Sequence, residues 1–326
     1  MSQAAAGGRA PTGVVVMDYG TPSSPEELLA YYTDIRRGRP PSAEQLADLR
    51  RRYDAIGGVS PLARCTAAQV AAISSALETL ETGAFLVAHG SKHSSPRIED
   101  AVDALAAQGA GRIVGLVLAP HYSRLSVGDY LARARARAEA AGLPSTFVES
   151  WHDEPALVEV LAERVTEAFA SLPAHADGRR ARPELVVTAH SLPSRILEDG
   201  DPYPDQLAET AALVAERAGV ARWRTGWQSA GRTPESWLGP DILEIIARLA
   251  DEGVTSVVVC PAGFTSDHLE VRYDLDVEAS SLARRLGLGF ARTESVNDEP
   301  RVARALALRV AAAAEEAWPE TSRDLR

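Results

Sequence analysis

The segment VVVCPAGFTSDHLEVRYDLDVE, residues 257–278, decides the fold because it joins an apolar strand to a polar loop. Its apolar run ends where the loop that carries His268 and Glu270 begins. A second segment, ELVVTAHSLP at 184–193, repeats this order and places His190 just beyond its own apolar run. Neither run alternates between apolar and polar residues, which is typical of strands buried on both faces of a parallel sheet. Ligands of open α/β sheets bind beyond the carboxyl ends of such strands.

The alternation of strand and helix continues along the whole chain. Short β-branched runs predict strands at 14–17, 85–87, 113–118, 185–187 and 257–259, and a weaker one at 223–227. Helical spacing of apolar residues lies between these runs, at 43–53, 66–80, 97–107, 127–141, 155–170, 204–218 and 242–250. Because strands and helices alternate, we expect an α/β fold of parallel sheets flanked by helices and joined by right-handed crossovers.

The length of the chain, 326 residues, is too great for one small core and suggests two domains. A crossover near 151–155, or in the polar loop 173–183, gives an N-terminal domain at 10–152 and a C-terminal domain at 153–299. The last helical segment, within 300–326, is expected to pack back on the first domain.

Charge and composition exclude several classes of protein. The 34 basic and 45 acidic residues give a net charge of −11, which argues against general nucleic-acid binding. No apolar run approaches the ~20 residues that span a membrane, and the first residues lack the apolar stretch of a secretory signal. We therefore expect a cytoplasmic protein without membrane insertion. The two cysteines, Cys65 and Cys260, are too few for an iron–sulfur cluster.

His190 and Glu270 would offer an imidazole and a carboxylate at the carboxyl ends of two strands. Together these groups tolerate a divalent first-row metal ion, and two protein ligands suit a metal that is passed on. His190 can also accept protons, because the ordinary pKa of histidine lies near neutral pH. The alternative is that His190 is a hydrogen-bonded structural histidine at a strand end, and its position alone does not separate the two.

Two carboxylates follow Glu270 at intervals of four residues, Asp274 and Glu278. On a helix this spacing places all three on one ridge. A ridge that faces a cleft can relay hydrated cations, and the alternative is a solvated acidic face.

Tyr19 and the arginine clusters are further candidates for ligand binding. Tyr19 follows the first predicted strand, and a tyrosine oxygen can ligate porphyrin iron; the alternative is a structural tyrosine beside a turn. Arginine-rich segments at 35–39 and 50–53 flank a GGVSPL turn that contains Ser60. In a chain of net charge −11 these segments favour recognition of an anion, with a solvated helix face as the alternative.

These segments resemble those of ferrochelatases, most closely the soluble coproporphyrin-type enzymes of Gram-positive bacteria. The resemblance rests on MDYGTP, YYTDIRRGRPP, YDAIGGVSPL, VLAPHYS, VVTAHSLP, GDPYPDQL, WQSAGRTPESWLGPD and GFTSDHLEV. It runs from about Val14 to the last helix, which is nearly the whole chain. It implies two Rossmann-like domains with an active-site cleft between them, and insertion of Fe²⁺, as a substrate, into a porphyrin without a tightly bound cofactor.

The resemblance also implies roles for individual residues. His190 and Glu270 match the pair that handles the incoming metal, and Tyr19 matches the tyrosine that ligates iron in the product. Positions around the porphyrin and its carboxylates are matched by Arg36, Arg52, Tyr53, Ser60 and Tyr130. Positions on the approach of the metal are matched by Lys92 and His93, and an outer site for a hydrated cation such as Mg²⁺ by Asp274 and Glu278.

The choice of porphyrin is predicted from residues 31–41. This stretch is polar and arginine-rich where membrane-associated relatives have an apolar lip, which favours coproporphyrin III with its four carboxylates. The alternatives are a protoporphyrin ferrochelatase, a cobalt or nickel tetrapyrrole chelatase, and a haem or porphyrin carrier without enzymatic activity. We expect a monomer whose partners are the porphyrin, Fe²⁺ and, transiently, enzymes of haem synthesis. Some actinobacterial relatives hold a [2Fe–2S] cluster through four cysteines, and this chain lacks that pattern.

Overall fold

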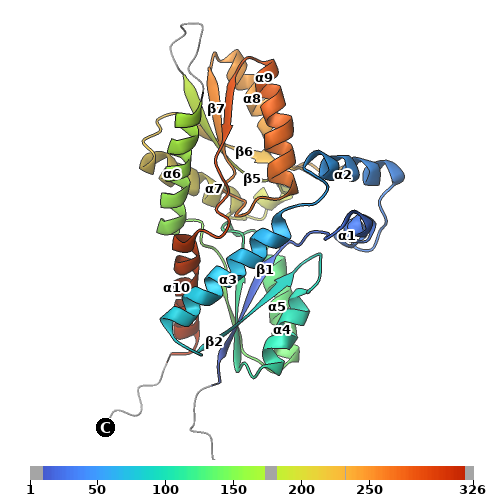
Figure 1. The fold of residues 1–326 in the computed structure, drawn as a ribbon, viewed down its shortest axis with the longest axis vertical. Coiled ribbons are helices and arrows are strands. Elements are labelled where there is room, and N and C mark those ends of the chain that lie inside the picture. Colours follow the sequence, from blue (N-terminus) through green and yellow to red (C-terminus); the bar gives the residue numbers. More distant parts are fainter. Residues whose placement is uncertain (1–9, 173–181, 232, 320–326) are drawn as a thin grey trace, which may run out of the picture.

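The computed structural model describes residues 10–172, 182–231 and 233–319. Two parallel sheets of four strands each lie one above the other along the longest axis of the molecule (Figure 1). Two predicted features lie mainly or partly outside the described residues: the loop at 173–183 as a domain crossover, and the end of the terminal segment at 320–326.

The first sheet has the strand order β2-β1-β3-β4 and is parallel throughout. Its strands are β1 (Thr12–Asp18), β2 (Phe85–Ser91), β3 (Arg112–Val117) and β4 (Ser145–Val148). Val14 and Val16 of β1 pack with the helices α3 (Leu62–Leu80) and α10 (Pro300–Ala317). Val15 and Met17 pack on the opposite face with α4 (Ile98–Ala107) and α5 (Val127–Ala140). Every residue of β1 is buried, as the lack of polar alternation predicts.

The second sheet repeats this plan with the order β6-β5-β7-β8. Its strands are β5 (Pro183–His190), β6 (Trp223–Gln228), β7 (Ser256–Cys260) and β8 (Gly289–Arg292). Val187 of β5 packs with α6 (Pro155–Ser171) and α7 (Tyr203–Arg217). Val186 packs with α8 (Ile242–Asp251), the π-helix η3 (Val271–Ala279) and α9 (Ser280–Arg285).

The two domains share part of their core. The apolar cluster that contains Val14 of the first sheet also contains Val187 of the second, together with residues of α3, α6, α7 and α10. The last helix, α10, packs on α3, β3 and β4 of the first domain and also on α6. A continuous apolar core of this kind favours a fixed arrangement of the domains over free hinge motion.

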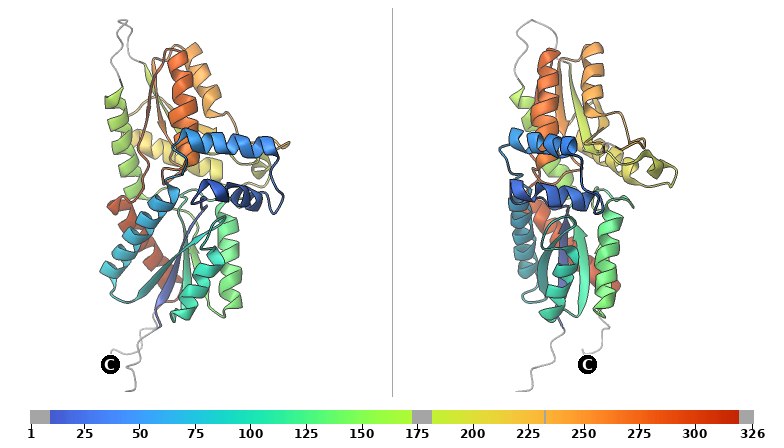
Figure 2. Two further views of the ribbon diagram at one scale, coloured as in Figure 1. Left: turned by 45° about the vertical axis from the view of Figure 1, so that its right-hand side comes forward. Right: turned by 90° about the vertical axis from the view of Figure 1, so that its right-hand side faces the viewer.

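Two helices project from the boundary between the domains (Figure 2). They are α1 (Leu28–Ile35), which follows the 3₁₀ turn η1 (Pro25–Glu27), and α2 (Ala43–Ala55). A capping box starts α2, because the Ser42 hydroxyl accepts from the Gln45 N–H and the Gln45 side chain accepts from the Ser42 N–H. A further 3₁₀ turn, η2 (Ser194–Leu197), follows β5.

Several elements differ from the prediction. The strands β4 and β8 and the helix α1 were not predicted, because four-residue edge strands and a helix that packs mainly on its neighbour leave little periodic signal. The segment that follows Glu270 is a nine-residue π-helix, with its wider turn, instead of an α-helix.

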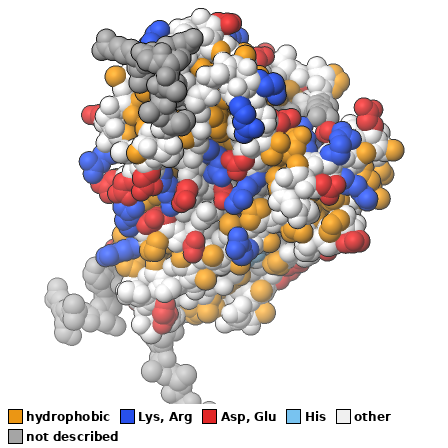
Figure 3. Space-filling model, turned by 45° about the horizontal axis from the view of Figure 1, so that its top comes forward, with side chains coloured by type: hydrophobic (Ala, Val, Ile, Leu, Met, Phe, Trp, Pro, Cys, Tyr) orange, Lys and Arg blue, Asp and Glu red, His pale blue; other side chains and the backbone are white. Residues whose placement is uncertain are grey.

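The distribution of charged side chains and the character of the helices agree with what the composition predicts. On the face drawn in Figure 3, acidic and basic side chains are interspersed and form no broad area of one sign. Within the described ranges, no helix has both the length and the apolar character needed to cross a bilayer.

Candidate active site

The carboxyl ends of β5 and β7 bring His190 and Glu270 together, as predicted. His190 is the last residue of β5, and Glu270 is the residue that precedes η3. The Nε2 atom of His190 lies 3.5 Å from Oε1 of Glu270. Both side chains are about one-third exposed, so the pair is open to a ligand and is not sealed in the core.

The orientation of the His190 ring is fixed by its backbone neighbour. Its Nδ1–H donates to the carbonyl oxygen of Ser191, which leaves Nε2 directed at Glu270. Tyr203 adds a restraint, because its hydroxyl donates to the His190 carbonyl over 3.0 Å. Burial alone would lower the pKa of His190, but Glu270 and the Ser191 carbonyl outweigh it and raise the pKa to about 8.

A second histidine, His268, lies on the other side of Glu270. Its Nε2 is 3.8 Å from Oε2 of Glu270, and its Nδ1 accepts a hydrogen bond from the Val271 N–H over 3.1 Å. The proton of the neutral ring is therefore on Nε2 and faces the carboxylate. Burial lowers the pKa of His268. Burial opposes ionisation of Glu270, but His190 and His268 outweigh it and lower the carboxyl pKa.

Tyr19, at the end of β1, belongs to the first domain and is 41 % exposed. Its ring centroid lies 4.6 Å from that of His93. Burial against the protein is the main cause that raises the pKa of its hydroxyl, and the Glu270 carboxylate adds to it. The same two causes raise the pKa of Tyr203. The Glu270 carboxylate therefore affects the pKa of a tyrosine from each domain, Tyr19 and Tyr203.

Lys92 and His93, predicted on the approach of the metal, follow β2 and are held by carboxylates. The Nζ of Lys92 lies 2.7 Å from Asp129 and stands 5.0 Å above the ring of Tyr130. The Nδ1 of His93 lies 2.7 Å from Asp34. Tyr130 itself is buried, and burial raises the pKa of its hydroxyl. Contact of Tyr130 with a porphyrin stays a prediction.

Arg52 on α2 reaches the second domain. Its Nη1 lies 3.8 Å from Asp274, its Nε lies 3.4 Å from Asp48, and its guanidinium stacks 5.0 Å above the ring of Tyr273. The projecting helix α2 is thus attached to η3. Arg52 is only a quarter exposed, so a carboxylated ligand would have to share it with Asp274.

The other predicted porphyrin-binding residues surround Arg52 in sequence. Arg36 follows α1 and donates to the carbonyl of Arg39 over 3.2 Å. Tyr53 is buried, and its hydroxyl is 3.2 Å from that of Thr21; burial is the main cause that raises its pKa to about 12. Ser60 is buried and accepts a hydrogen bond from Leu62 at the start of α3.

Asp274 is not part of a solvated acidic face, since it is only 6 % exposed. Burial and the neighbouring Glu270 raise its pKa to about 7, against the opposing effects of Ser229 and Arg52. Glu278, which follows Asp274 by four residues in η3, also raises the pKa of Asp274. The predicted outer cation site at Asp274 and Glu278 stays a prediction.

Three contributors to the site were missed or left without a role by the sequence prediction: His268, Tyr203 and Ser229. His268 was noted in the loop after the predicted strand 257–259 but received no role of its own. The φ of Ser229 is +62°, which is uncommon for residues other than glycine. A serine in the sequence gives no indication of such a backbone conformation. Tyr203 stood in GDPYPDQL, which contributed only to the resemblance.

The site has few protein ligands for a metal. Over residues 10–172, 182–231 and 233–319, no group of three or more His, Cys, Asp or Glu side chains is arranged to hold a metal ion. What remains is an imidazole base directed at a carboxylate and flanked by a second imidazole. Such a set can bind a cation weakly and accept protons from the same ligand.

A separate cavity of about 270 Å³ lies on the second domain. Its lining consists of Asp276, Ser280, Phe290, Ala291, Arg292 and Glu294. None of the predicted site residues lines it, and its arginine is paired with Asp276 at 2.7 Å. We therefore place the candidate active site at His190 and Glu270.

Comparison with known proteins identifies relatives over most of the chain. The sequence model of the family Ferrochelatase matches residues 11–314. A coproporphyrin III ferrochelatase of Anoxybacillus flavithermus is 47% identical over 298 residues, covering 90% of this chain and 94% of that protein. The coproporphyrin III ferrochelatases of Geobacillus sp. and Bacillus subtilis are each 46% identical, covering 90% of this chain and 95% of theirs.

Solved structures share the fold at low sequence identity. The chelatase SirB from Bacillus subtilis, determined with Fe³⁺, gives a TM-score of 0.58 at 13% identity and covers 94% of this chain and 97% of its own. CbiX, the terminal enzyme of sirohaem biosynthesis in denitrifying bacteria, gives a TM-score of 0.51 at 14% identity, covering 93% of this chain and 99% of its own. These matches confirm the predicted architecture of two Rossmann-like domains.

Proposed function

The chain belongs to the ferrochelatase family, and on that premise we propose that it inserts Fe²⁺ into coproporphyrin III to give the iron complex, coprohaem. The enzyme is a metal chelatase, a lyase of haem synthesis. The observation that carries the proposal is the 3.5 Å approach of His190 and Glu270 at adjoining strand ends. Relatives that are 45–47% identical over 90% of the chain support the choice of metal and porphyrin.

The reaction exchanges two protons for one metal ion. A free porphyrin carries two N–H protons inside the ring, and both leave as Fe²⁺ binds the four nitrogens. His190 accepts a proton through Nε2, because Nδ1 is committed to the Ser191 carbonyl. Glu270 holds the arriving metal or takes the second proton. A cation that binds Glu270 also weakens the attraction between Glu270 and a protonated His190, which favours the neutral base.

Weak binding of the metal is part of the proposal. The pair supplies two protein ligands, and a metal held by two ligands can be transferred to a porphyrin that supplies four. The enzyme gains rate when its contacts favour a porphyrin distorted toward the transition state over the planar substrate. In this proposal Tyr19 would ligate the iron of the product through its phenolic oxygen.

The proposed porphyrin carries four carboxylates, and arginines near α1 and α2 are suited to bind them. Arg36 and Arg52 flank this region, and arginine binds carboxylates through paired N–H donors. Protoporphyrin has two carboxylates and would leave some of these donors without partners, which disfavours it.

The test is an anaerobic assay of Fe²⁺ insertion with coproporphyrin III and protoporphyrin IX, followed by absorbance. We expect a higher kcat/KM with coproporphyrin III. A higher kcat/KM with protoporphyrin IX would overturn the choice of porphyrin. Competition with Co²⁺ and Ni²⁺ in the same assay checks the metal. A rate no greater than that without protein would instead indicate a porphyrin carrier.

A further inference from the structure

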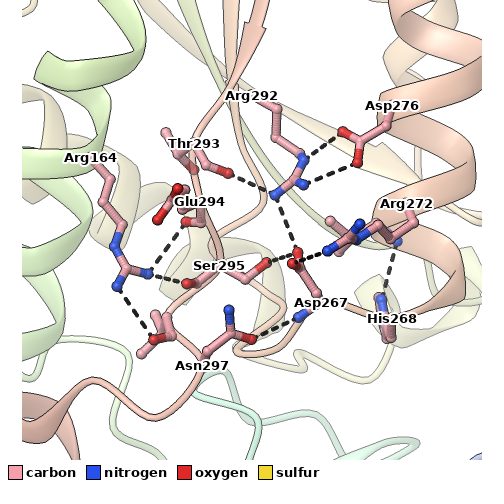
Figure 4. A network of polar contacts seen from close by, with 12 residues as sticks. Arg164, Asp267, His268, Arg272, Asp276, Arg292, Thr293, Glu294, Ser295 and Asn297 are labelled. Carbon is pink, nitrogen blue, oxygen red and sulfur yellow. Dashed lines mark hydrogen bonds and ion pairs between the residues drawn. The ribbon is translucent and has the colours of Figure 1, made fainter. Parts of the chain in front are cut away.

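Asp267 is a carboxylate at the centre of a polar network beside the active site (Figure 4). It lies in the loop between β7 and η3, one residue before His268 and three before Glu270. Its side chain is 14 % exposed. It does not belong to the predicted site, and no contact joins it to His190 or Glu270 among those that the described residues make.

Arg272 closes a short loop around the functional residues. Its Nη2 donates to Oδ2 of Asp267 over 2.8 Å, and its backbone N–H donates to the His268 carbonyl over 2.9 Å. Since Arg272 is the second residue of η3, the pair ties the residue before His268 to the first turn of the helix. Both ends of the segment that contains His268 and Glu270 are therefore fixed.

Arg292 connects the same carboxylate to the sheet. It is the last residue of β8 and is paired in register with Val259 of β7. Its Nη1 lies 3.3 Å from Oδ1 of Asp267, and its Nε and Nη2 donate to the two oxygens of Asp276 over 2.7 and 3.0 Å. Sites held by strands are more precise than sites held by loops. Asp267 thus takes its position from the sheet.

The backbone of Asp267 is anchored as well. Its N–H donates to Oδ1 of Asn297 over 3.1 Å, and Asn297, with a φ of +48°, donates its own N–H to the Thr265 carbonyl over 2.7 Å. The Thr265 hydroxyl donates to the carbonyl of Leu118 over 2.9 Å, which reaches the first domain. The Ser295 hydroxyl completes the set with a 2.9 Å bond to Oδ1 of Asp267.

We propose that Asp267 is a positioning residue that holds the loop 265–270 so that Glu270 faces His190. Asp267 acts only through the backbone of this loop and takes no part in binding or proton transfer. The physical reason is that a carboxylate on a loop must be held within about 0.5 Å to work with a partner on another strand. The role in catalysis rests on the proposed function.

The first experiment compares Asp267→Asn with Asp276→Asn. Both carboxylates pair with Arg292, but Asp276 lies on η3 and does not touch the loop. We expect Asp267→Asn to lower kcat roughly 10- to 100-fold, as for residues that orient metal ligands. The affinity for coproporphyrin III, from fluorescence quenching, should stay unchanged. Asp276→Asn should keep the wild-type kcat. Equal kcat in the two variants would overturn the proposal.

Two neutral variants separate positioning from a simple effect of charge. Asn297→Gly keeps the positive φ accessible but removes the acceptor of the Asp267 N–H, and Ser295→Ala removes a donor to its carboxylate. Both should lower kcat in the same direction, by less than Asp267→Asn. If only the loss of the charge lowers kcat, positioning is wrong.

Hydrogen exchange gives a readout that does not depend on activity. Peptides that cover 261–275 should exchange faster in Asp267→Asn than in Asp276→Asn, because the Asn amide group cannot accept from Arg272 at Oδ2 and loss of the charge weakens the pair with Arg292. Equal exchange would overturn the inference even if the protein proved to have no chelatase activity. Faster exchange in a protein without that activity would retain the positioning role and reject only the proposed function.

Discussion

The hydroxyl of Ser229 donates a hydrogen bond to the carboxyl of Asp274, which joins the end of β6 to the π-helix η3. Ser229 is held at a φ of +62°, and such a conformation persists in a serine only where the surroundings enforce it. Arg52 approaches the same carboxyl from α2, at 3.8 Å. Asp274 is therefore the point where the second sheet, the π-helix and the projecting helix meet.

The raised pKa of Asp274, about 7, predicts that this residue destabilises the fold at neutral and alkaline pH. The folded state binds the proton more tightly than the unfolded chain, so the favourable contribution is complete below the ordinary pKa of ~3.9 and is lost as pH rises through about 7. Asp274→Asn cannot ionise, so its stability does not decrease in this way as the pH rises. Its Tm relative to wild type should increase between pH 4 and pH 8, as measured by calorimetry.

The matched control for this prediction is Asp276→Asn. Asp276 is exposed and bonded to Arg292, so its replacement should lower Tm or leave it unchanged at pH 8. A Tm difference between Asp274→Asn and wild type that stays constant with pH would contradict the buried, protonated carboxyl.

Replacing His190 should separate chemistry from binding. His190→Ala removes the proposed proton acceptor, and general bases contribute about 100- to 10,000-fold to rate. We expect iron insertion to fall by at least about 100-fold, while coproporphyrin III still quenches protein fluorescence with a similar dissociation constant. Anaerobic stopped-flow absorbance measures the first quantity. Turnover at the wild-type rate would eliminate His190 as the base.

Glu270 should control the protonation of His190. The pKa of His190 is about 8 because burial, which lowers it, is outweighed by the combined effects of Glu270 and the Ser191 carbonyl. Glu270→Gln removes the negative charge, so the pKa should fall to or below the ordinary value of ~6.5. NMR titration of the imidazole in the metal-free protein measures this. An unchanged midpoint would mean that the two groups do not interact in solution.

Arg52 should contribute to binding of porphyrin carboxylates. Arg52→Ala is expected to weaken coproporphyrin III about 10- to 100-fold, the value of a charge-assisted hydrogen bond, and to weaken protoporphyrin IX less. The control is Arg51→Ala, since Arg51 is on the same helix and pairs with Asp48 but is 66% exposed. Equal losses for both porphyrins, by fluorescence titration, would remove the argument for carboxylate recognition.

The sequence predicted the parts of the site that follow from strand ends. His190 ends one apolar run, and Glu270 lies in the loop that follows another, and parallel strands bring such loops to one edge of the sheet. Asp267 could not be found in this way, although it stands in the quoted segment. Its partners Ser295 and Arg292 are 28 and 25 residues away, and no periodic pattern links them.

The strands were predicted correctly where burial produces long apolar runs in the sequence. The prediction failed where it does not. The central strands β1, β5 and β7 were found, whereas β8 (GFAR) has four residues that are all partly exposed. The spacing of Glu270, Asp274 and Glu278 fits an α-helix and a π-helix alike. The backbone hydrogen bonds distinguish the two helices, and η3 packs on α2 and α8, which are distant from it in sequence.

The π-helix η3 sets a constraint on how this segment can evolve. Its backbone bonds skip one residue more than those of an α-helix, so deletion of a single residue would allow the tighter ladder to form. The residues that precede the deletion would then rotate by about 100° about the helix axis. Glu270 would no longer face His190. We expect homologous chains to vary freely in amino-acid type along the exposed side of 271–279 while conserving its length.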